Sequence, residues 1–138
     1  MTHRVTFILQ EESSSTNRIA FLCTLLTLWY RRGQSCFCLT PDQDYNTYLD
    51  DQLWSFSASV FLPHTQGPVS KVHQIHLSND PDHAAGATTI FNCTQDCLVE
   101  FQPDCEHIEF GIASDKNRLR KLYKNYQNQN LSLSFLRM

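Results

Sequence analysis

The amino-acid sequence predicts a three-layer α/β/α fold built on a mainly parallel sheet. Residues 3–10 alternate apolar and polar side chains, residues 35–39 form a short apolar run, and a strongly apolar helical segment separates the two. Strand, helix and strand in this order form a βαβ unit, for which we expect parallel pairing through a right-handed crossover. Helices on both faces of such a sheet give the three layers.

The first helix is expected to run to about Arg32. Residues 13–16 supply capping candidates at its start, and the cations Arg31 and Arg32 followed by Gly33 are typical of a helix end. Its apolar run, residues 19–30, is only twelve residues long. A membrane-spanning helix needs about 20 such residues, so we expect a buried helix instead.

The middle of the chain predicts a second helix, an irregular segment and further strands. Pro41 and Asp42 begin the helix, which continues to about Trp54. The irregular segment covers residues 55–70. The strands expected after it are residues 71–77, 88–93 and, from a weaker pattern, 105–112.

A last helix and an extended tail complete what we expect to be a single domain, residues 1–138. Ser114 and Asp115 are the capping residues of the helix, which runs to about Gln127. The tail from Leu131 alternates apolar and serine residues, so it should lie extended along the body of the protein.

The six cysteines and the net charge limit the class of protein. Cys36 and Cys38 alternate in an apolar segment and therefore share one face of a strand, as small core residues do. The chain starts without a charged and then apolar export signal, so we expect reduced, structural thiols in the cytoplasm. A net charge of −3 argues against DNA binding by the whole surface.

Signals for a nucleotide, cofactor or metal site are missing from the sequence. The four glycines are not clustered as a phosphate-binding loop requires, and Glu11 and Glu12 would repel a phosphate at the start of the first helix. The fold therefore resembles nucleotide-binding folds but lacks a nucleotide site. The histidines are widely spaced, although a spatial cluster of Cys and His side chains stays open as an alternative. We expect no catalytic residues, no cofactor and no metal.

Two stretches have the composition of contact surfaces. Residues 53–64 place large apolar groups and a proline on irregular backbone, which suits the anchors of a protein interface. The alternative is that Trp54 and Phe61 merely cover the edge of the sheet.

The last helix is strongly basic. Between residues 114 and 127 five cations face one acid, a local charge of +4, so the remainder of the chain carries −7. Arg120, Tyr123, Lys124 and Gln127 fall on one helix face. Such a face suits an acidic peptide that ends in a hydrophobic residue and a carboxylate. A nucleic-acid backbone or a plain solvated face are the alternatives.

These two stretches resemble the chi subunit family of bacterial DNA polymerase III. The first match is Leu53-Trp54, six residues, then Phe61-Leu62-Pro63-His64; the second is Arg120-x-x-Tyr123-Lys124-x-Tyr126 in a C-terminal helix. The resemblance covers essentially the whole chain, but residues 65–105 match only in outline.

The resemblance implies a non-catalytic adaptor in DNA replication with two protein partners. The psi subunit, which connects the family to the clamp loader, would bind Trp54, Phe61 and Pro63. The acidic C-terminal tail of single-stranded-DNA-binding protein would bind a separate surface, whose residues by resemblance are Arg120, Tyr123, Lys124 and, less securely aligned, Gly111 and Arg137. A repair-type DNA helicase is a further partner that the resemblance suggests for the Trp54 region.

Two other functions stay open at this point. One is an enzyme of the nucleotide-binding α/β class, and the other is direct binding of single-stranded nucleic acid by the basic helix. The resemblance favours the adaptor, with little direct DNA binding and no membrane contact.

Overall fold

The computed structural model describes residues 3–11, 17–56, 62–70 and 74–138 of the 138-residue chain. The helices of this part are α1 (Arg18–Arg31), α2 (Gln43–Ser55) and α3 (Lys116–Gln127), with short 3-10 turns η1 (Pro81–Ala84) and η2 (Ala113–Asp115). The strands are β1 (Arg4–Gln10), β2 (Cys36–Leu39), β3 (His64–Gln66), β4 (Ile75–Ser78), β5 (Thr89–Asn92), β6 (Glu106–Ile112) and β7 (Ser132–Arg137).

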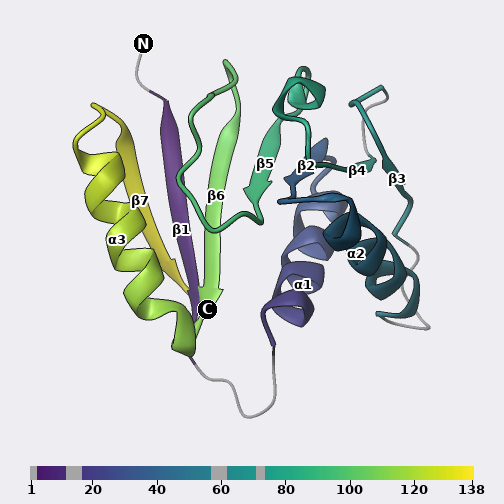
Figure 1. The fold of residues 1–138 in the computed structure, drawn as a ribbon, viewed down its shortest axis with the longest axis horizontal. Helices are drawn as coiled ribbons and strands as arrows, with labels where there is room; N and C mark the ends of the chain where they lie inside the picture. The colour runs from purple at the N-terminus through teal and green to yellow at the C-terminus, as the bar shows by residue number, and fades with distance from the viewer. Residues whose placement is uncertain (1–2, 12–16, 57–61, 71–73) are drawn as a thin grey trace.

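All seven of these strands form one sheet, in the order β3-β4-β2-β5-β6-β1-β7, and every pair is parallel. Helices α1 and α2 pack their apolar side chains on one face of the sheet, and α3 packs on the other, against β1. Figure 1 shows α3 beside β1 and β7, while α1 and α2 lie toward the opposite end of the sheet. The predicted three-layer α/β/α fold is confirmed.

The direct pairing expected for the two strands of the first βαβ unit is wrong. β1 pairs with β6 and β7, and two strands, β5 and β6, lie between β1 and β2. The connection through α1 therefore crosses two strand positions, which later segments of the chain fill. The sequence pattern indicates that a strand is buried, but it does not say which strand is its neighbour.

The segment expected to be irregular contains the edge strand β3, which pairs with β4. β3 has only three residues, two of them exposed, so no alternating pattern marked it. The weak pattern at residues 105–112 proves to be β6, one of the longest strands, with five buried residues in succession. A strand buried on both faces loses the alternation that usually identifies one.

The helix starts differ in part from those expected. Residues 13–16, expected to cap α1, lie outside the described residues, and the side chain of Asn17 accepts a hydrogen bond from the Ala20 amide at 2.7 Å instead. Asp42 caps α2 as expected, by accepting from the Tyr45 amide at 2.8 Å.

At the start of α3, residues 113–115 form the turn η2, and Asp115 makes no side-chain capping bond to the helix. Its carboxylate instead accepts from the Ile112 amide at 2.9 Å and pairs with Arg18. Asp115 therefore occupies the N-cap position of α3 as expected, but its side chain does not make the expected capping hydrogen bond to the helix.

The cysteines behave as core residues. Cys36 and Cys38 are fully buried in the same apolar cluster, as their alternation predicted. All six thiols are free, and only Cys97 is partly exposed. Burial raises the pKa of the Cys23, Cys36 and Cys105 thiols to about 12, so these groups stay protonated at neutral pH. Among the described residues, no helix has the length and apolar content to cross a membrane.

Candidate functional site

A pocket of about 320 Å³ lies between α3 and the adjoining strands β1 and β7. Its lining combines apolar and aromatic groups with cations, and consists of Phe7, Leu9, Lys116, Leu119, Arg120, Tyr123, Phe135 and Arg137. We call this the α3–β7 groove.

The floor of the groove is apolar because β1 and α3 turn core-facing residues toward it. Phe7 and Leu9 of β1 are almost fully buried and pack against Leu119 of α3. The ring of Tyr123 lies 5.2 Å from that of Phe7, tilted by 56°, within the range of favourable aromatic contacts. An aromatic or aliphatic side chain of a ligand would therefore find a preformed surface here.

The rim of the groove carries three cations. Lys116 and Arg120 lie one turn apart on α3, and Arg137 lies on β7 across the groove. The guanidinium of Arg137 contacts the Phe135 ring, at 5.5 Å from its centroid, and pairs with Glu11, with 2.6 Å between Nη1 and Oε1. Within the described part of the chain, Arg120 makes no ion pair and only a long hydrogen bond, 3.5 Å, to Asn117. The positive charge of Arg120 and Lys116 is thus available to an anion.

Three of the five residues expected to bind an acidic tail line this groove: Arg120, Tyr123 and Arg137. Lys124 is exposed on the next turn of α3 after Arg120, outside the lining. Gly111 is buried in β6 beneath the start of α3. A β-carbon built on Gly111 would lie 2.7 Å from the β-carbon of Asp115. This glycine therefore permits the close approach of the turn before α3 to the sheet and offers no group to a ligand.

Sequence reasoning missed the other half of the groove. Phe7 and Leu9 belong to the predicted strand at residues 3–10, whose alternation places both on one face, but nothing in that pattern marks them as binding residues. Phe135 lies in the alternating tail, and Lys116 lies one turn before Arg120 on the same helix. The sequence pattern could therefore have indicated both residues as part of the groove. In contrast, Arg118, one of the five cations of the basic helix, points inward. It donates to the Phe110 carbonyl at 3.0 Å, and its side chain is only 18% exposed.

A buried hydrogen-bond network holds α3 in place behind the groove. The carboxylate of Glu109 accepts from the Tyr126 hydroxyl and from the Asn92 amide, each at 2.6 Å. The Tyr126 hydroxyl in turn accepts from the Leu98 amide at 2.7 Å. Burial raises the pKa of Glu109 to about 7, although both hydrogen bonds and Arg118 act in the opposite direction. Its other oxygen, Oε1, has no hydrogen-bond partner.

The second candidate surface lies at the far edge of the sheet. Trp54, at the end of α2, is 56% exposed, and its ring centroid lies 4.5 Å from that of His64 on β3. Nδ1 of His64 lies 2.8 Å from the Leu62 carbonyl, and Asp50 lies 3.0 Å from Nε2, outside hydrogen-bonding geometry. Pro63 is partly exposed beside these rings, and Phe61 lies outside the described residues.

The two surfaces are well separated in space. β3 and β7 are the two edge strands of the sheet, with five strands between them. α2, which carries Trp54, contacts β3, whereas α3 contacts β7. The structure therefore keeps the groove and the Trp54 surface apart.

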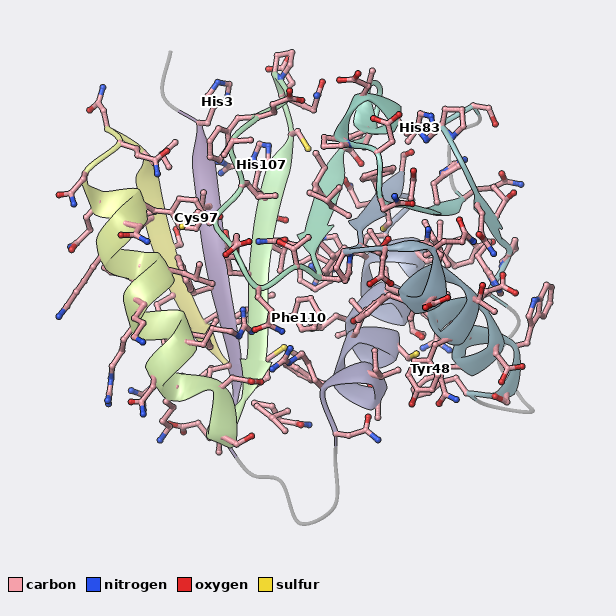
Figure 2. All side chains as sticks on the ribbon, in the orientation of Figure 1. His3, Tyr48, His83, Cys97, His107 and Phe110 are labelled. Atoms are coloured by element: carbon pink, nitrogen blue, oxygen red, sulfur yellow. The ribbon has the colours of Figure 1, made fainter. Side chains whose placement is uncertain are left out.

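One arrangement in the structure resembles catalytic machinery. Ser78 Oγ lies 2.8 Å from Nδ1 of His83, and Nε2 of His83 lies 3.5 Å from Asp80. Ser78, however, is only 5% exposed and also accepts from the Asp80 amide at 3.1 Å, which makes these contacts part of a local turn. Figure 2 shows His83 far from α3, the helix that forms one wall of the groove. In the described ranges, no three His, Cys, Asp or Glu residues are placed to hold a metal ion.

The fold and the groove are those of an α/β protein with a cationic, aromatic surface pocket on one flank of its sheet. The family model described as DNA polymerase III chi subunit, HolC, matches residues 1–134, and the chain belongs to this family. It is thus an accessory subunit of DNA polymerase III that associates with other components of the holoenzyme. No match to a curated protein was found.

Proposed function

We propose that this protein is a non-catalytic adaptor that links the clamp loader, through the psi subunit, to the C-terminal tail of single-stranded-DNA-binding protein. The observation that carries the proposal is the α3–β7 groove, where an apolar floor lies directly beside Lys116 and Arg120, two cations that make no ion pair in the described part of the chain. Joining two partners through separate surfaces raises their effective concentration, so each contact can be modest. We propose that residues 1–138 act as one domain in the cytoplasm, where these partners function.

The groove fits an acidic peptide that ends in an aromatic residue. The terminal ring would pack on Phe7 and Tyr123, and the terminal carboxylate would lie between Arg120 and Arg137. A guanidinium can bind a carboxylate through two parallel hydrogen bonds, which favours arginine at this place. Upstream acids of the peptide would reach Lys116 and Lys124, which continue the row of cations along α3. Gly111 would act indirectly, by keeping the start of α3 close to the sheet.

The Trp54 surface is the proposed site for the psi subunit. The exposed indole of Trp54 contacts the buried His64 ring at a tilt of 50°. An aromatic anchor held in this way loses little side-chain entropy when a partner covers it. Pro63 and Phe61 would extend the same contact. A repair-type DNA helicase is a second candidate for this surface, and it would then compete with psi.

Calorimetry with a synthetic acidic peptide that ends in phenylalanine tests the groove. We expect Arg120→Ala and Tyr123→Ala to weaken binding about tenfold or more, which corresponds to the loss of about 1.4 kcal/mol. Lys121→Ala is the matched control, because Lys121 is exposed on α3 outside the groove. Binding should also weaken as salt is raised, since the cations lie near solvent. Equal losses in all three variants would contradict the assignment of the groove.

Co-purification with psi tests the second surface. We expect Trp54→Ala to impair psi pairing and to leave peptide binding unchanged, while Arg120→Ala does the reverse. Circular dichroism of each variant shows whether the domain is still folded. If each variant impairs both partners while remaining folded, the two-surface adaptor is wrong.

The row of cations on α3 favours direct binding of single-stranded DNA as a second candidate function. In that case a titration with an oligonucleotide would give tighter binding than the acidic peptide, with a steep dependence on salt. The apolar floor of the groove argues for the peptide.

A further inference from the structure

The contact between Glu11 and Arg137 places an acid of the chain itself at the mouth of the α3–β7 groove. Arg137 lines the groove, and its Nη1 lies 2.6 Å from Oε1 of Glu11. The Arg137 side chain is 64% exposed and that of Glu11 is 41% exposed. Among the described residues, the guanidinium is held by this pairing and by the Phe135 ring alone. The same guanidinium is one of the two that the proposed function assigns to the ligand carboxylate.

We propose that Glu11 is a built-in competitor for the groove, which occupies Arg137 until the carboxylate of an incoming acidic peptide displaces it. This inference rests on the proposed function and adds a regulatory residue to it. Glu11 would weaken the binding of every anion at Arg137, so that a peptide with several acids still binds while a single weak anion does not.

The backbone positions Glu11 for this role. The Glu11 amide donates to the Met138 carbonyl at 3.2 Å, and the Met138 amide donates to the Leu9 carbonyl at 2.9 Å. These two bonds continue the pairing of β1 with β7 beyond the last residues of both strands. They hold residue 11 beside residue 137, so the two side chains meet without any tertiary rearrangement.

The charges around the groove explain why this one acid matters. Lys116, Arg120 and Arg137 line the groove. A second carboxylate near it in the described part of the chain, that of Asp115, is 7% exposed and pairs with Arg18. Glu11 is therefore the acid that a ligand carboxylate would meet at Arg137. If it stays in place, it repels the ligand; if it swings into solvent, the ligand takes over its partner.

A rival role predicts the opposite sign. If Glu11 served to orient Arg137 toward the ligand, removing its charge would weaken binding. The competitor role predicts that Glu11→Gln tightens binding, because the amide no longer holds the guanidinium or repels an acid. Exposed ion pairs contribute little, so the gain should be about threefold, which corresponds to about 0.65 kcal/mol.

The experiment is a double-mutant cycle, with affinities measured by calorimetry at low salt for an acidic peptide that ends in phenylalanine. Glu100→Gln is the matched control, because it removes the same charge from an exposed position outside the groove. We expect Glu11→Gln to bind about threefold more tightly than wild type and Glu100→Gln to match wild type. Once Arg137 is changed to Gln, Glu11→Gln should have a smaller effect, because only the repulsion between Glu11 and the acids of the peptide is then removed. The gain should shrink at high salt.

Each result separates the two proposals. If wild type binds the peptide but Glu11→Gln does no better than Glu100→Gln, or binds more weakly, the competitor role is overturned and the adaptor function stands. If Glu11→Gln binds the peptide and wild type does not, the competitor role of Glu11 is supported and its effect is larger than about threefold. If wild type and every variant fail to bind the peptide, the tail-binding function and the competitor role are both wrong.

Discussion

The buried carboxyl of Glu109 should make the stability of this protein depend on pH. Its pKa is raised to about 7 in the folded chain, whereas 4.5 is the ordinary value for a glutamate. Above about pH 4.5 the unfolded chain releases this proton first, so the folded state loses stability as pH rises, and the loss is complete somewhat above pH 7. Linkage with these two values gives a loss of about 2 kcal/mol between pH 5.5 and pH 8.

Glu109→Gln is the perturbation that isolates this effect. The amide oxygen of glutamine can accept the hydrogen bonds from Tyr126 and Asn92 as the carboxylate does, but the side chain does not titrate. Its NH₂ group would take the place of Oε1, which has no partner, so a fixed cost of about 1–3 kcal/mol is expected at every pH. The informative quantity is therefore the change of stability with pH and not its absolute value.

Urea unfolding of both proteins at several pH values between 5.5 and 8 is the assay. Burial lowers the pKa of His76 and His107, so these side chains add stability as pH rises, with the opposite sign to Glu109. They contribute equally to both proteins and cancel in the difference. We expect the difference in the free energy of unfolding between wild type and Glu109→Gln to change by about 2 kcal/mol from pH 5.5 to pH 8, in favour of the variant. A gap that stays constant with pH would refute the reasoning.

Three further predictions concern the packing and the thiols. Gly111→Ala should cost about 1–3 kcal/mol in urea unfolding, because its β-carbon would meet that of Asp115 at 2.7 Å; an unchanged midpoint would mean that the turn before α3 moves freely. Asn17→Ala should cost about 1 kcal/mol through the lost cap of α1, and Asn17→Asp should restore most of it, as measured by thermal unfolding. Alkylation of the native protein followed by mass spectrometry should modify Cys97 first, since it is the one partly exposed thiol of the six; rapid labelling of several thiols would contradict the burial described above.

The sequence alone determined what depends on local pattern. The α/β class, the end of α1, the extent of α2 and the burial of Cys36 and Cys38 all follow from which side chains recur at helix or strand spacing. The placement of Arg120 and Tyr123 on one face of α3 follows in the same way, because residues three apart on a helix are neighbours.

Only the tertiary structure decided which elements become neighbours. β1 lies between β6 and β7, whose residues are about a hundred or more positions away along the chain, and no local pattern encodes such a pairing. The second wall of the groove, Phe135 and Arg137, exists because the tail joins β1 as an edge strand. The tertiary structure likewise decided that the Arg118 side chain points inward, toward the Phe110 carbonyl. Periodicity reports that a side chain is buried, whereas its contacts depend on strand order, which is set by packing of the whole sheet.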